Sequence, residues 1–351
     1  MELTVVRLKS DPAEDETRFG AVLSDALEGL EYRTVSRLTA GTDYRGRRLL
    51  FAVPLGRFGE NAALRHLLGQ LRSEAVRLDG AVSAIFVDAE SELYTKEAAT
   101  ELAFALNAAG SALVGRPLVE GTRSLANFKV QAKTLGTDLE GAYRASLRDL
   151  AERLCEDSFP RREKPVLLAL HASNYMTSNT MQLWGRVKER LGEEIAVEEI
   201  GLRNGTIFDC AGCPYTACRH FGEAGRCFYG GPMTDEVWPA VRRADALILL
   251  CPNYNDALSA NLTAFINRLT GLFRQTRFYD KAVFAIIVSG YSGSDLVARQ
   301  LIGAMNMNKS FYLPPRFCMI ETANDPGEAL SLPGIDGRID AFAERIRAAL
   351  R

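Results

Sequence analysis

The chain has 351 residues, which is long for one typical domain and suits two. Hydrophobic residues make up 47% and charged residues 25%, as in ordinary soluble globular proteins, and 42 basic residues against 44 acidic ones leave a net charge of −2. This balance argues against binding to nucleic acid or to an anionic membrane surface. No apolar run approaches the roughly 20 residues of a membrane span.

The first half of the chain predicts alternating strands and helices. Apolar runs and helical spacing place strands at 3–10, 32–38, 49–56 and 81–88, and helices at 18–30, 61–72 and 138–154. The first strand is followed by "SDPAEDET" (10–17), which holds four carboxylates. Such a loop repels phosphate, so we expect residues 1–157 to form a domain without a cofactor site.

The second half predicts the same alternation after a polar segment at 155–165 that contains two prolines. Strands are expected at 165–172, 195–202, 244–254, 281–289 and 310–320, and helices at 178–194, 259–273, 295–308 and 336–351. Strands that alternate with helices favour a parallel sheet covered on both faces. We therefore predict an α/β protein of two tandem flavodoxin-like domains, each with a five-stranded parallel sheet and helices on both faces.

The two halves resemble each other in sequence. "AVSAIFVD" (81–88) is close to "AVFAIIVS" (282–289), and 107–117 corresponds to 306–316, which lies 199 residues later. A nearly constant offset indicates a tandem duplication in which the N-terminal copy is degenerate and serves structure or pairing.

Chemistry in such a sheet belongs at the carboxyl ends of the strands. There the second half has "HASNYMTSNT" (171–180), which is rich in hydroxyl and amide side chains, has no acid, and ends where a helix begins. Hydroxyl groups beside a helix N-terminus form a site for an anion such as phosphate.

Residues 164–351 resemble the family of NADPH-dependent FMN reductases and iron–sulfur flavoproteins. The first loop of that family, G-S-x-R-x-x-S-N-T, corresponds to "ASNYMTSNT" (172–180), with Ala172 and Tyr175 in place of Gly and Arg. The second loop, S-P-V-Y-W-G-S-V-S-A-x-L-K-x-F-I-D-R, corresponds to "CPNYNDALSANLTAFINR" (251–268), with Asn255 and Asp256 in place of Trp and Gly. "SGYSG" (289–293) resembles the third.

The resemblance implies an FMN site in the C-terminal domain. The first loop would hold the phosphate, and the other two would lie along the isoalloxazine ring. The residues implied are Ser173, Ser178, Asn179, Thr180, Pro252, Asn253, Tyr254, Asn255, Ser289, Gly290 and Tyr291.

Four of the seven cysteines, Cys210, Cys213, Cys218 and Cys227, lie in an insertion at 210–227 with the spacing C-x2-C-x4-C-x8-C. The N-terminus does not resemble a signal peptide, so we expect a cytoplasmic chain with reduced thiols, in which clustered cysteines bind metal or act in catalysis. Iron–sulfur members of the family carry the tighter spacing C-x2-C-x2-C-x5-C at this place. Three alternatives stay open: a [4Fe–4S] cluster, a structural zinc ion, or four free thiols.

These patterns predict an FMN-dependent oxidoreductase that transfers electrons from NAD(P)H to a quinone or another small acceptor, with a [4Fe–4S] cluster as an additional carrier in one alternative. No catalytic side chain is assigned, because the flavin carries the chemistry. The alternatives are an electron-transfer iron–sulfur flavoprotein without nicotinamide turnover and a zinc-stabilised, non-enzymatic interaction module. Expected partners are a small-molecule acceptor or a redox protein, and the chain is expected to be a pseudo-dimeric monomer or a homodimer.

Overall fold

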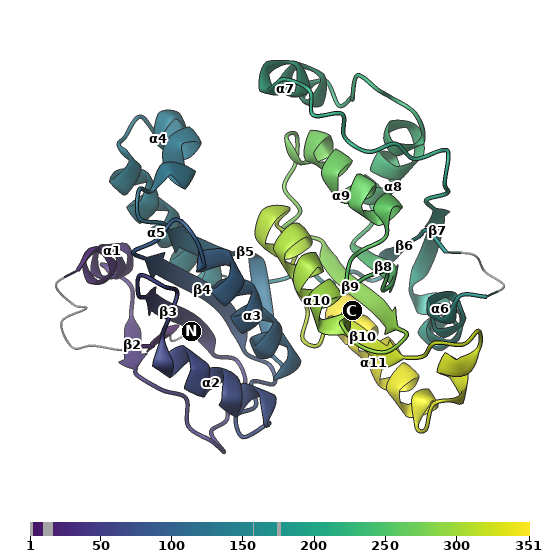
Figure 1. Ribbon diagram of the computed structural model, residues 1–351. Coiled ribbons are helices and arrows are strands. Elements are labelled where there is room, and N and C mark those ends of the chain that lie inside the picture. Colours follow the sequence, from purple (N-terminus) through teal and green to yellow (C-terminus); the bar gives the residue numbers. More distant parts are fainter. Residues whose placement is uncertain (1–2, 10–16, 157, 174–176) are drawn as a thin grey trace. The chain divides into compact units, whose positions relative to one another are not determined.

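The computed structural model describes residues 3–9, 17–156, 158–173 and 177–351. The chain divides into two compact units, Met1–Ser158 and Phe159–Arg351, each with its own sheet (Figure 1). None of the helices in these described ranges is long and apolar enough to cross a bilayer.

The N-terminal unit forms one parallel sheet in the strand order β2-β1-β3-β4-β5. Its strands are β1 (Leu3–Arg7), β2 (Tyr32–Val35), β3 (Arg48–Leu55), β4 (Val82–Ala89) and β5 (Ala112–Gly121). Its α-helices are α1 (Arg18–Leu27), α2 (Ala62–Arg72), α3 (Thr95–Ala108), α4 (Lys129–Leu135) and α5 (Leu139–Glu156).

The C-terminal unit forms a second parallel sheet in the order β10-β9-β8-β6-β7. Its strands are β6 (Val166–His171), β7 (Ala196–Gly201), β8 (Ala246–Pro252), β9 (Ala282–Ser289) and β10 (Cys318–Thr322). Its α-helices are α6 (Asn179–Leu191), α7 (Tyr215–Glu223), α8 (Trp238–Arg243), α9 (Ala260–Phe273), α10 (Ser294–Leu301) and α11 (Ile335–Leu350). Both sheets have the flavodoxin-like order, so the predicted fold class is confirmed.

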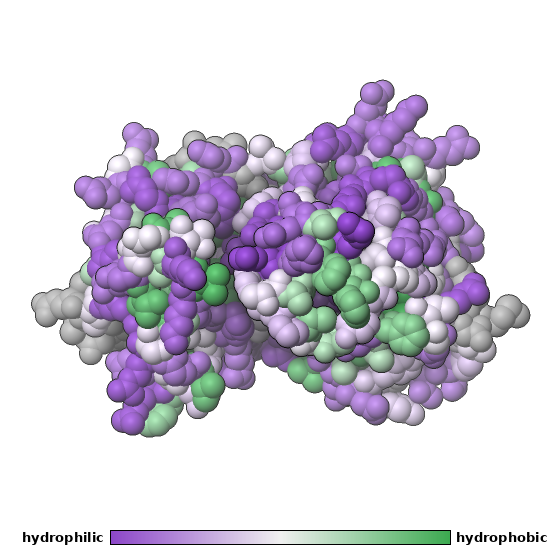
Figure 2. Space-filling view, turned by 90° about the horizontal axis from the view of Figure 1, so that it is seen from above, coloured by the Kyte–Doolittle hydropathy of each residue, from purple (hydrophilic) through white to green (hydrophobic). Residues whose placement is uncertain are grey.

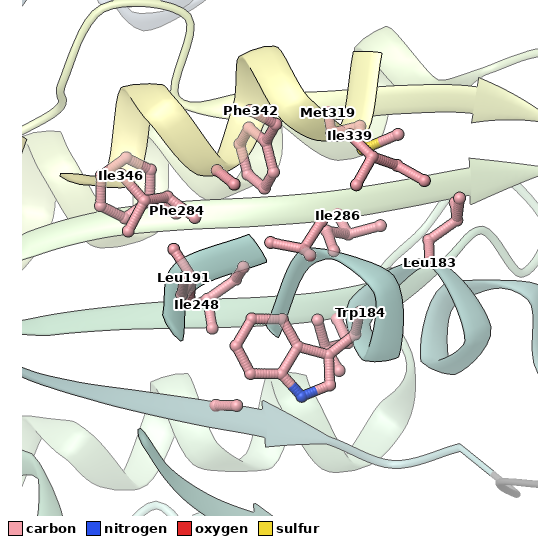
Figure 3. Packing of buried hydrophobic residues seen from close by; sticks show 14 of the residues in the cluster. Leu183, Trp184, Leu191, Ile248, Phe284, Ile286, Met319, Ile339, Phe342 and Ile346 are labelled. Carbon is pink, nitrogen blue, oxygen red and sulfur yellow. The ribbon is translucent and has the colours of Figure 1, made fainter. Parts of the chain in front are cut away.

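Burial on both faces explains why the central strands of the second sheet are apolar throughout. Alternate residues such as Ile248 and Ile286 point to one face, where they pack with Trp184 of α6 and Phe342 of α11 (Figure 3). The residues between them point to the other face, and β8 and β9 are almost completely buried. A strand covered by helices on both sides has no polar face, so apolar and polar residues do not alternate along it.

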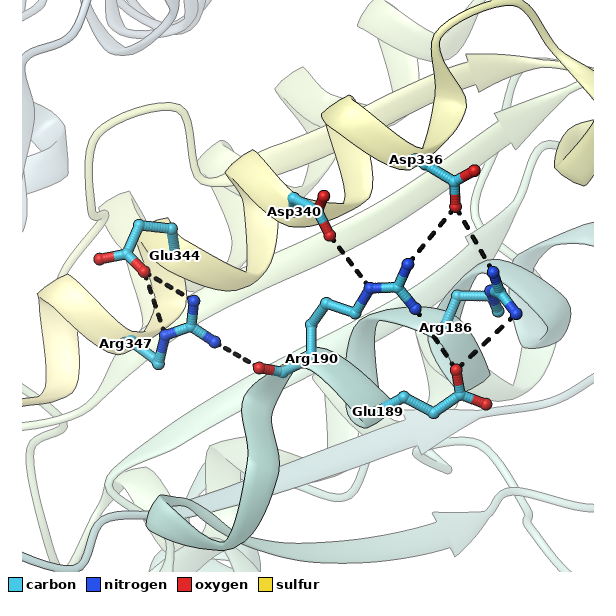
Figure 4. Close-up of polar contacts among 7 residues, drawn as sticks. All are labelled: Arg186, Glu189, Arg190, Asp336, Asp340, Glu344 and Arg347. Atoms are coloured by element: carbon cyan, nitrogen blue, oxygen red, sulfur yellow. Dashed lines mark hydrogen bonds and ion pairs between the residues drawn. The ribbon is translucent and has the colours of Figure 1, made fainter.

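Helices α6 and α11 also share a row of exposed ion pairs (Figure 4). Arg190 Nε donates to Asp340 Oδ1 at 3.0 Å, and Arg190 Nη2 lies 3.5 Å from Asp336 Oδ1. Exposed pairs of this kind contribute about 0–1 kcal/mol each, so the apolar contacts below them dominate the packing. The first turn of α6 follows β6 and lies at the carboxyl edge of the sheet.

The last strand is shorter than the sequence pattern predicts. The prediction was 310–320, whereas β10 begins at Cys318. Residues 310–317 contain Pro314 and Pro315, which cannot donate to a strand ladder, and this stretch meets the sheet through isolated contacts such as the bridge from Tyr312 to Ala282.

Candidate functional site

Three loops meet at the carboxyl edge of the second sheet. They follow β6, β8 and β9, which end at His171, Pro252 and Ser289. The backbone N–H of Asn253 donates to Val288 O at 2.8 Å, and its side-chain Nδ2 donates to Ser289 Oγ at 2.9 Å. These bonds hold the second and third loops together as one surface.

The first loop ends at the N-terminus of α6. Ser178 is the N-cap residue, with its Oγ accepting from the Met181 N–H at 3.4 Å and lying 2.7 Å from Thr180 Oγ1. The buried Oγ of Ser173 has no hydrogen-bond partner among the described residues. A helix N-terminus with two serine hydroxyls beside it suits an anion. Tyr175, which replaces the arginine of the family, lies outside the described residues.

Asn179 has a structural task. Its Nδ2 donates to Asp325 O at 2.9 Å and to Ala323 O at 3.4 Å, and its Oδ1 accepts from the N–H groups of Gly327 at 3.0 Å and Ala329 at 3.3 Å. These bonds use the whole amide, so only the backbone N–H of Asn179 is left for a ligand. Thr180 is also buried, with 1% of its surface exposed.

The second loop turns tightly at Asn255 and Asp256. Their φ angles are 54° and 59°, and Tyr254 and Ala257 exchange two backbone hydrogen bonds across the turn, at 3.2 and 3.1 Å. Two successive left-handed residues form a type I′ turn, in which Asn and Asp are favoured. The Asn-Asp pair in place of the Trp-Gly of the family therefore suits this backbone.

Two residues that sequence reasoning missed brace this turn. Gln300 of α10 accepts from the Leu258 N–H at 3.2 Å and donates to Asp256 O at 3.1 Å. Gly293 has a φ of 86°, and a Cβ there would lie 1.9 Å from Asp256 Oδ1. Only their approach in space reveals these roles, although the Gly in "SGYSG" was a signal for a turn.

The third loop presents one side chain and buries another. Ser289 is 1% exposed, and its Oγ accepts from Asn253 and lies 2.6 Å from Ser294 Oγ. Tyr291 is 82% exposed and Tyr254 on the neighbouring loop is 57% exposed. Two aromatic rings thus stand open to solvent where a planar ligand would lie, while Ser289 shapes the loop from below.

Buried polar atoms without partners test whether a flavin mononucleotide fits. Ser173 Oγ, Asn253 Oδ1 and Ser259 Oγ are all buried and have no hydrogen-bond partner among the described residues. Ser259 precedes α9 but makes no side-chain cap bond to it. Unpaired buried polar atoms are rare, and here they belong to the loops that follow β6 and β8. The residues present fit a ligand with a phosphate and a polar ring.

His171 lies beneath the first loop at the end of β6. It is 4% exposed, and its Nε2 is 3.8 Å from Glu199 Oε1 of β7. Burial lowers the pKa of His171, and the Glu199 carboxylate opposes this shift. Glu199 Oε2 also accepts a hydrogen bond from Trp184 Nε1 at 2.9 Å. The imidazole is therefore held neutral and in place next to the candidate anion site.

The four clustered cysteines line a single cavity of about 400 Å³. All four are free thiols, and Cys210 is exposed while the other three are half-buried. Nevertheless, no group of three or more His, Cys, Asp or Glu side chains in the described part of the chain is arranged to hold a metal ion. The structure thus supports neither the [4Fe–4S] cluster nor the zinc ion that the spacing predicts.

The fold and these loops define a flavodoxin-like domain with a candidate FMN site. Residues 165–325 match the model of the family described as NADPH-dependent FMN reductase. This match confirms the resemblance predicted for the C-terminal half of the chain, and it does not extend to the N-terminal half. No curated protein matches the sequence significantly.

Several solved structures are similar to part of the chain. The NAD(P)H:quinone oxidoreductase from Methanothermobacter marburgensis is 17% identical, with 53% of this chain and 97% of that chain covered and a TM-score of 0.38. An FMN-dependent NADH-azoreductase from Bacillus anthracis, solved with FMN, is 14% identical, with 52% and 99% covered and a TM-score of 0.38. RosB with a bound riboflavin-phosphate intermediate is 15% identical, with 53% and 78% covered and a TM-score of 0.40. At these values, none of the similarities bears on the activity of this chain.

Proposed function

We propose that the C-terminal unit binds FMN and that the chain takes electrons from NAD(P)H and passes them to a small acceptor such as a quinone. The family match supports the cofactor and the donor. The observation that carries the proposal is the set of unpartnered polar atoms on the loops after β6 and β8, namely Ser173 Oγ, Asn253 Oδ1 and Ser259 Oγ.

The phosphate would lie at the start of α6. Ser173 and Ser178 would donate their hydroxyl protons to phosphate oxygens, and the first backbone N–H groups of α6 would complete the shell. No cation among the described residues of this loop contributes, because Tyr175 replaces the arginine of the family. Hydroxyl groups and the helix dipole therefore supply the attraction.

The isoalloxazine ring would lie along Pro252–Asn255 and Gly290–Tyr291. The Asn253 amide oxygen would accept a hydrogen bond from a ring N–H, and the exposed rings of Tyr254 and Tyr291 would flank the flavin or the entering nicotinamide. When bound, FMN accepts hydride from the nicotinamide and passes electrons to the acceptor. The chain itself binds and orients, and we assign no side chain to acid–base catalysis.

A [4Fe–4S] cluster is left out of this proposal, and so is structural zinc. The four thiols line a cavity, but the described side chains do not converge on a metal position. The remaining alternative, electron transfer without nicotinamide turnover, differs from our proposal in steady-state oxidation of NAD(P)H.

We further propose that the N-terminal unit binds no flavin. At the end of β4, Asp88 forms an ion pair with Arg18 at 2.8 Å and accepts a hydrogen bond from Tyr143 Oη at 2.6 Å. Arg18 Nη1 also donates to Arg123 O at 3.1 Å. These side chains occupy the carboxyl edge of the first sheet. The equivalent edge of the second sheet carries the unpartnered polar atoms.

The first test is an absorption spectrum of the protein purified without oxygen, followed by titration with NADPH and with NADH. The proposal predicts flavin bands that bleach on addition of a nicotinamide and return on addition of benzoquinone. A colourless protein that binds no added FMN would contradict the proposal. Bound flavin that neither nicotinamide reduces would leave the electron-transfer alternative.

A further inference from the structure

The cavity that the cysteines line is partly open to solvent and has an aromatic wall. It lies between the segment 209–229 and helix α9, and Phe221, Phe228 and Trp238 contribute rings to it. Figure 2 shows hydrophobic side chains gathered around a hollow on the upper face of the molecule, the face to which α7 belongs. A volume of about 400 Å³ falls within the range of roughly 300–1,000 Å³ that small-molecule sites occupy.

The polar atoms in this cavity are mostly donors. Trp238 is 1% exposed, and its Nε1–H has no hydrogen-bond partner among the described residues. Arg268 is 6% exposed and donates from Nη2 to Gly230 O at 2.8 Å. Arg226 is an exposed cation in the lining. A buried indole N–H without an acceptor, in a cavity that two arginines also line, favours a ligand that brings its own oxygen acceptor.

Two side-chain acceptors of the lining residues are already engaged. Asp209 Oδ1 accepts from Asn267 Nδ2 at 2.9 Å and from the Cys210 N–H at 2.6 Å. Thr270 Oγ1 accepts from Lys309 Nζ at 2.9 Å. A ligand with donors only would find few partners here, whereas an anion would meet two guanidinium groups.

We propose that this cavity binds a small planar aromatic molecule that carries a carboxylate. Its ring would pack against Phe221 and Phe228, and its carboxylate would accept from Trp238 Nε1 and Arg268. The four cysteines would act as small, polarisable wall residues rather than as metal ligands. Of the three alternatives that the cysteine spacing leaves open, this proposal corresponds to four free thiols.

This site is separate from the proposed flavin site. Helix α9 begins at Ala260 beside the flavin loop and reaches the cavity from Asn267 onward. Seven residues of helix span roughly 10 Å at a rise of about 1.5 Å per residue. The proposal therefore does not depend on whether the chain binds FMN.

The test is calorimetric titration of the whole chain, saturated with added FMN, with 2-naphthoate. We expect one saturable site per chain and at least tenfold weaker binding of the uncharged analogue 2-naphthalenemethanol. Arg268→Gln and Phe228→Ala should each weaken 2-naphthoate binding about tenfold or more. Arg299→Gln, which removes an exposed arginine of α10, is the matched control and should bind as the wild type does.

Two further measurements distinguish loss of binding from misfolding of a variant and show whether the cysteines hold a metal. The chain has two tryptophans, so Trp184→Phe leaves Trp238 as the single indole, and its ¹⁵N–H resonance should shift on addition of 2-naphthoate. Replacement of all four clustered cysteines by serine should preserve that shift. About one zinc ion or four iron atoms per purified chain would overturn the proposal, and so would the absence of saturable binding at millimolar 2-naphthoate.

Discussion

Ser178 serves the helix and, in our proposal, the ligand. As the N-cap of α6 it accepts from the Met181 N–H, and its hydroxyl proton would reach a phosphate when Thr180 Oγ1 is the donor in the hydrogen bond that the two hydroxyls share. Asn179, one residue later, is used completely by the segment 323–329. Neighbouring residues of one motif thus divide into one that meets the ligand and one that fixes the loop.

Ser178→Ala should weaken both functions. We expect the free energy of unfolding to fall by about 1 kcal/mol through loss of the cap. The dissociation constant of FMN should rise about ten- to a hundredfold, because a hydrogen bond to a charged group contributes about 1.5–3 kcal/mol. Fluorescence titration with FMN measures the second effect. Asn61→Ala, which removes the N-cap of α2 in the N-terminal unit, is the control and should change stability alone.

His171 should make stability depend on pH. Burial holds its pKa in the folded chain below the ordinary value of 6.5, so the unfolded chain binds the proton more readily. Its contribution to stability is therefore complete above about pH 6.5 and is lost as the pH falls through the lower, folded pKa.

The check is urea unfolding of flavin-free protein at pH 7.5 and at pH 5.0. The wild type should lose more stability between these two values than His171→Gln does. Equal losses in the two proteins would show that the imidazole does not titrate as the structure implies.

At the scale of elements, the flavin edge depends on turns rather than on strands. The β8–α9 loop reverses at two left-handed residues and is braced by Gln300 of α10. Strand β8, helix α9 and helix α10 together position the loop, which makes it more rigid than a single hairpin. In our proposal, the surface that would take the flavin ring is therefore formed before a ligand arrives.

Asn255→Val should distort this surface. A β-branched residue in the left-handed region costs roughly 1–2 kcal/mol, so stability should fall by that amount and FMN affinity should fall with it. Asn255→Gly removes the same side chain but accepts the backbone conformation, and it should retain stability. Thermal melts and FMN titration of the two variants distinguish strain from loss of an amide contact, which both variants share.

At the scale of the whole molecule, both units have left-handed residues at similar places, one position away from the correspondence of 107–117 with 306–316. Gly110 and Ser310 have φ angles of 104° and 68°, and Arg116 and Arg316 have φ angles of 50° and 49°, with the members of each pair 200 residues apart (310 − 110 and 316 − 116). Left-handed residues other than glycine are uncommon, so this agreement favours the duplication, which stays a prediction.

One FMN per chain is the expected stoichiometry. The N-terminal edge is filled by the Arg18–Asp88 ion pair, whereas the C-terminal edge has unpartnered polar atoms. Equilibrium dialysis against FMN should saturate at one equivalent, and Arg18→Ala should not create a second site, because the acidic loop at 10–17 repels phosphate. Two equivalents in the wild type would show that the first unit is not degenerate.

The fold could be predicted from the sequence because every central strand is a short apolar run between helices. The site could be predicted only in part. The loops were located by their motifs, but the role of Asn179 depends on contacts more than 140 residues away. The stretch 310–317 has apolar residues that are buried outside strand β10. Apolar content alone therefore predicts a strand there. The cysteine spacing indicates possible metal ligands but does not show whether the four thiols converge on one metal position.

Strand β7 lies at the edge of the second sheet and carries Glu198 and Glu199 at its centre. Each carboxylate is held by a partner from a helix, Glu198 by Arg243 and Glu199 by Trp184. An open edge offers unpaired backbone groups to any other strand, and two adjacent negative charges oppose such pairing. The residues that hold α6 and α8 against the sheet therefore also place charged side chains on its open edge, and we expect these charges to disfavour edge-to-edge association of separate copies.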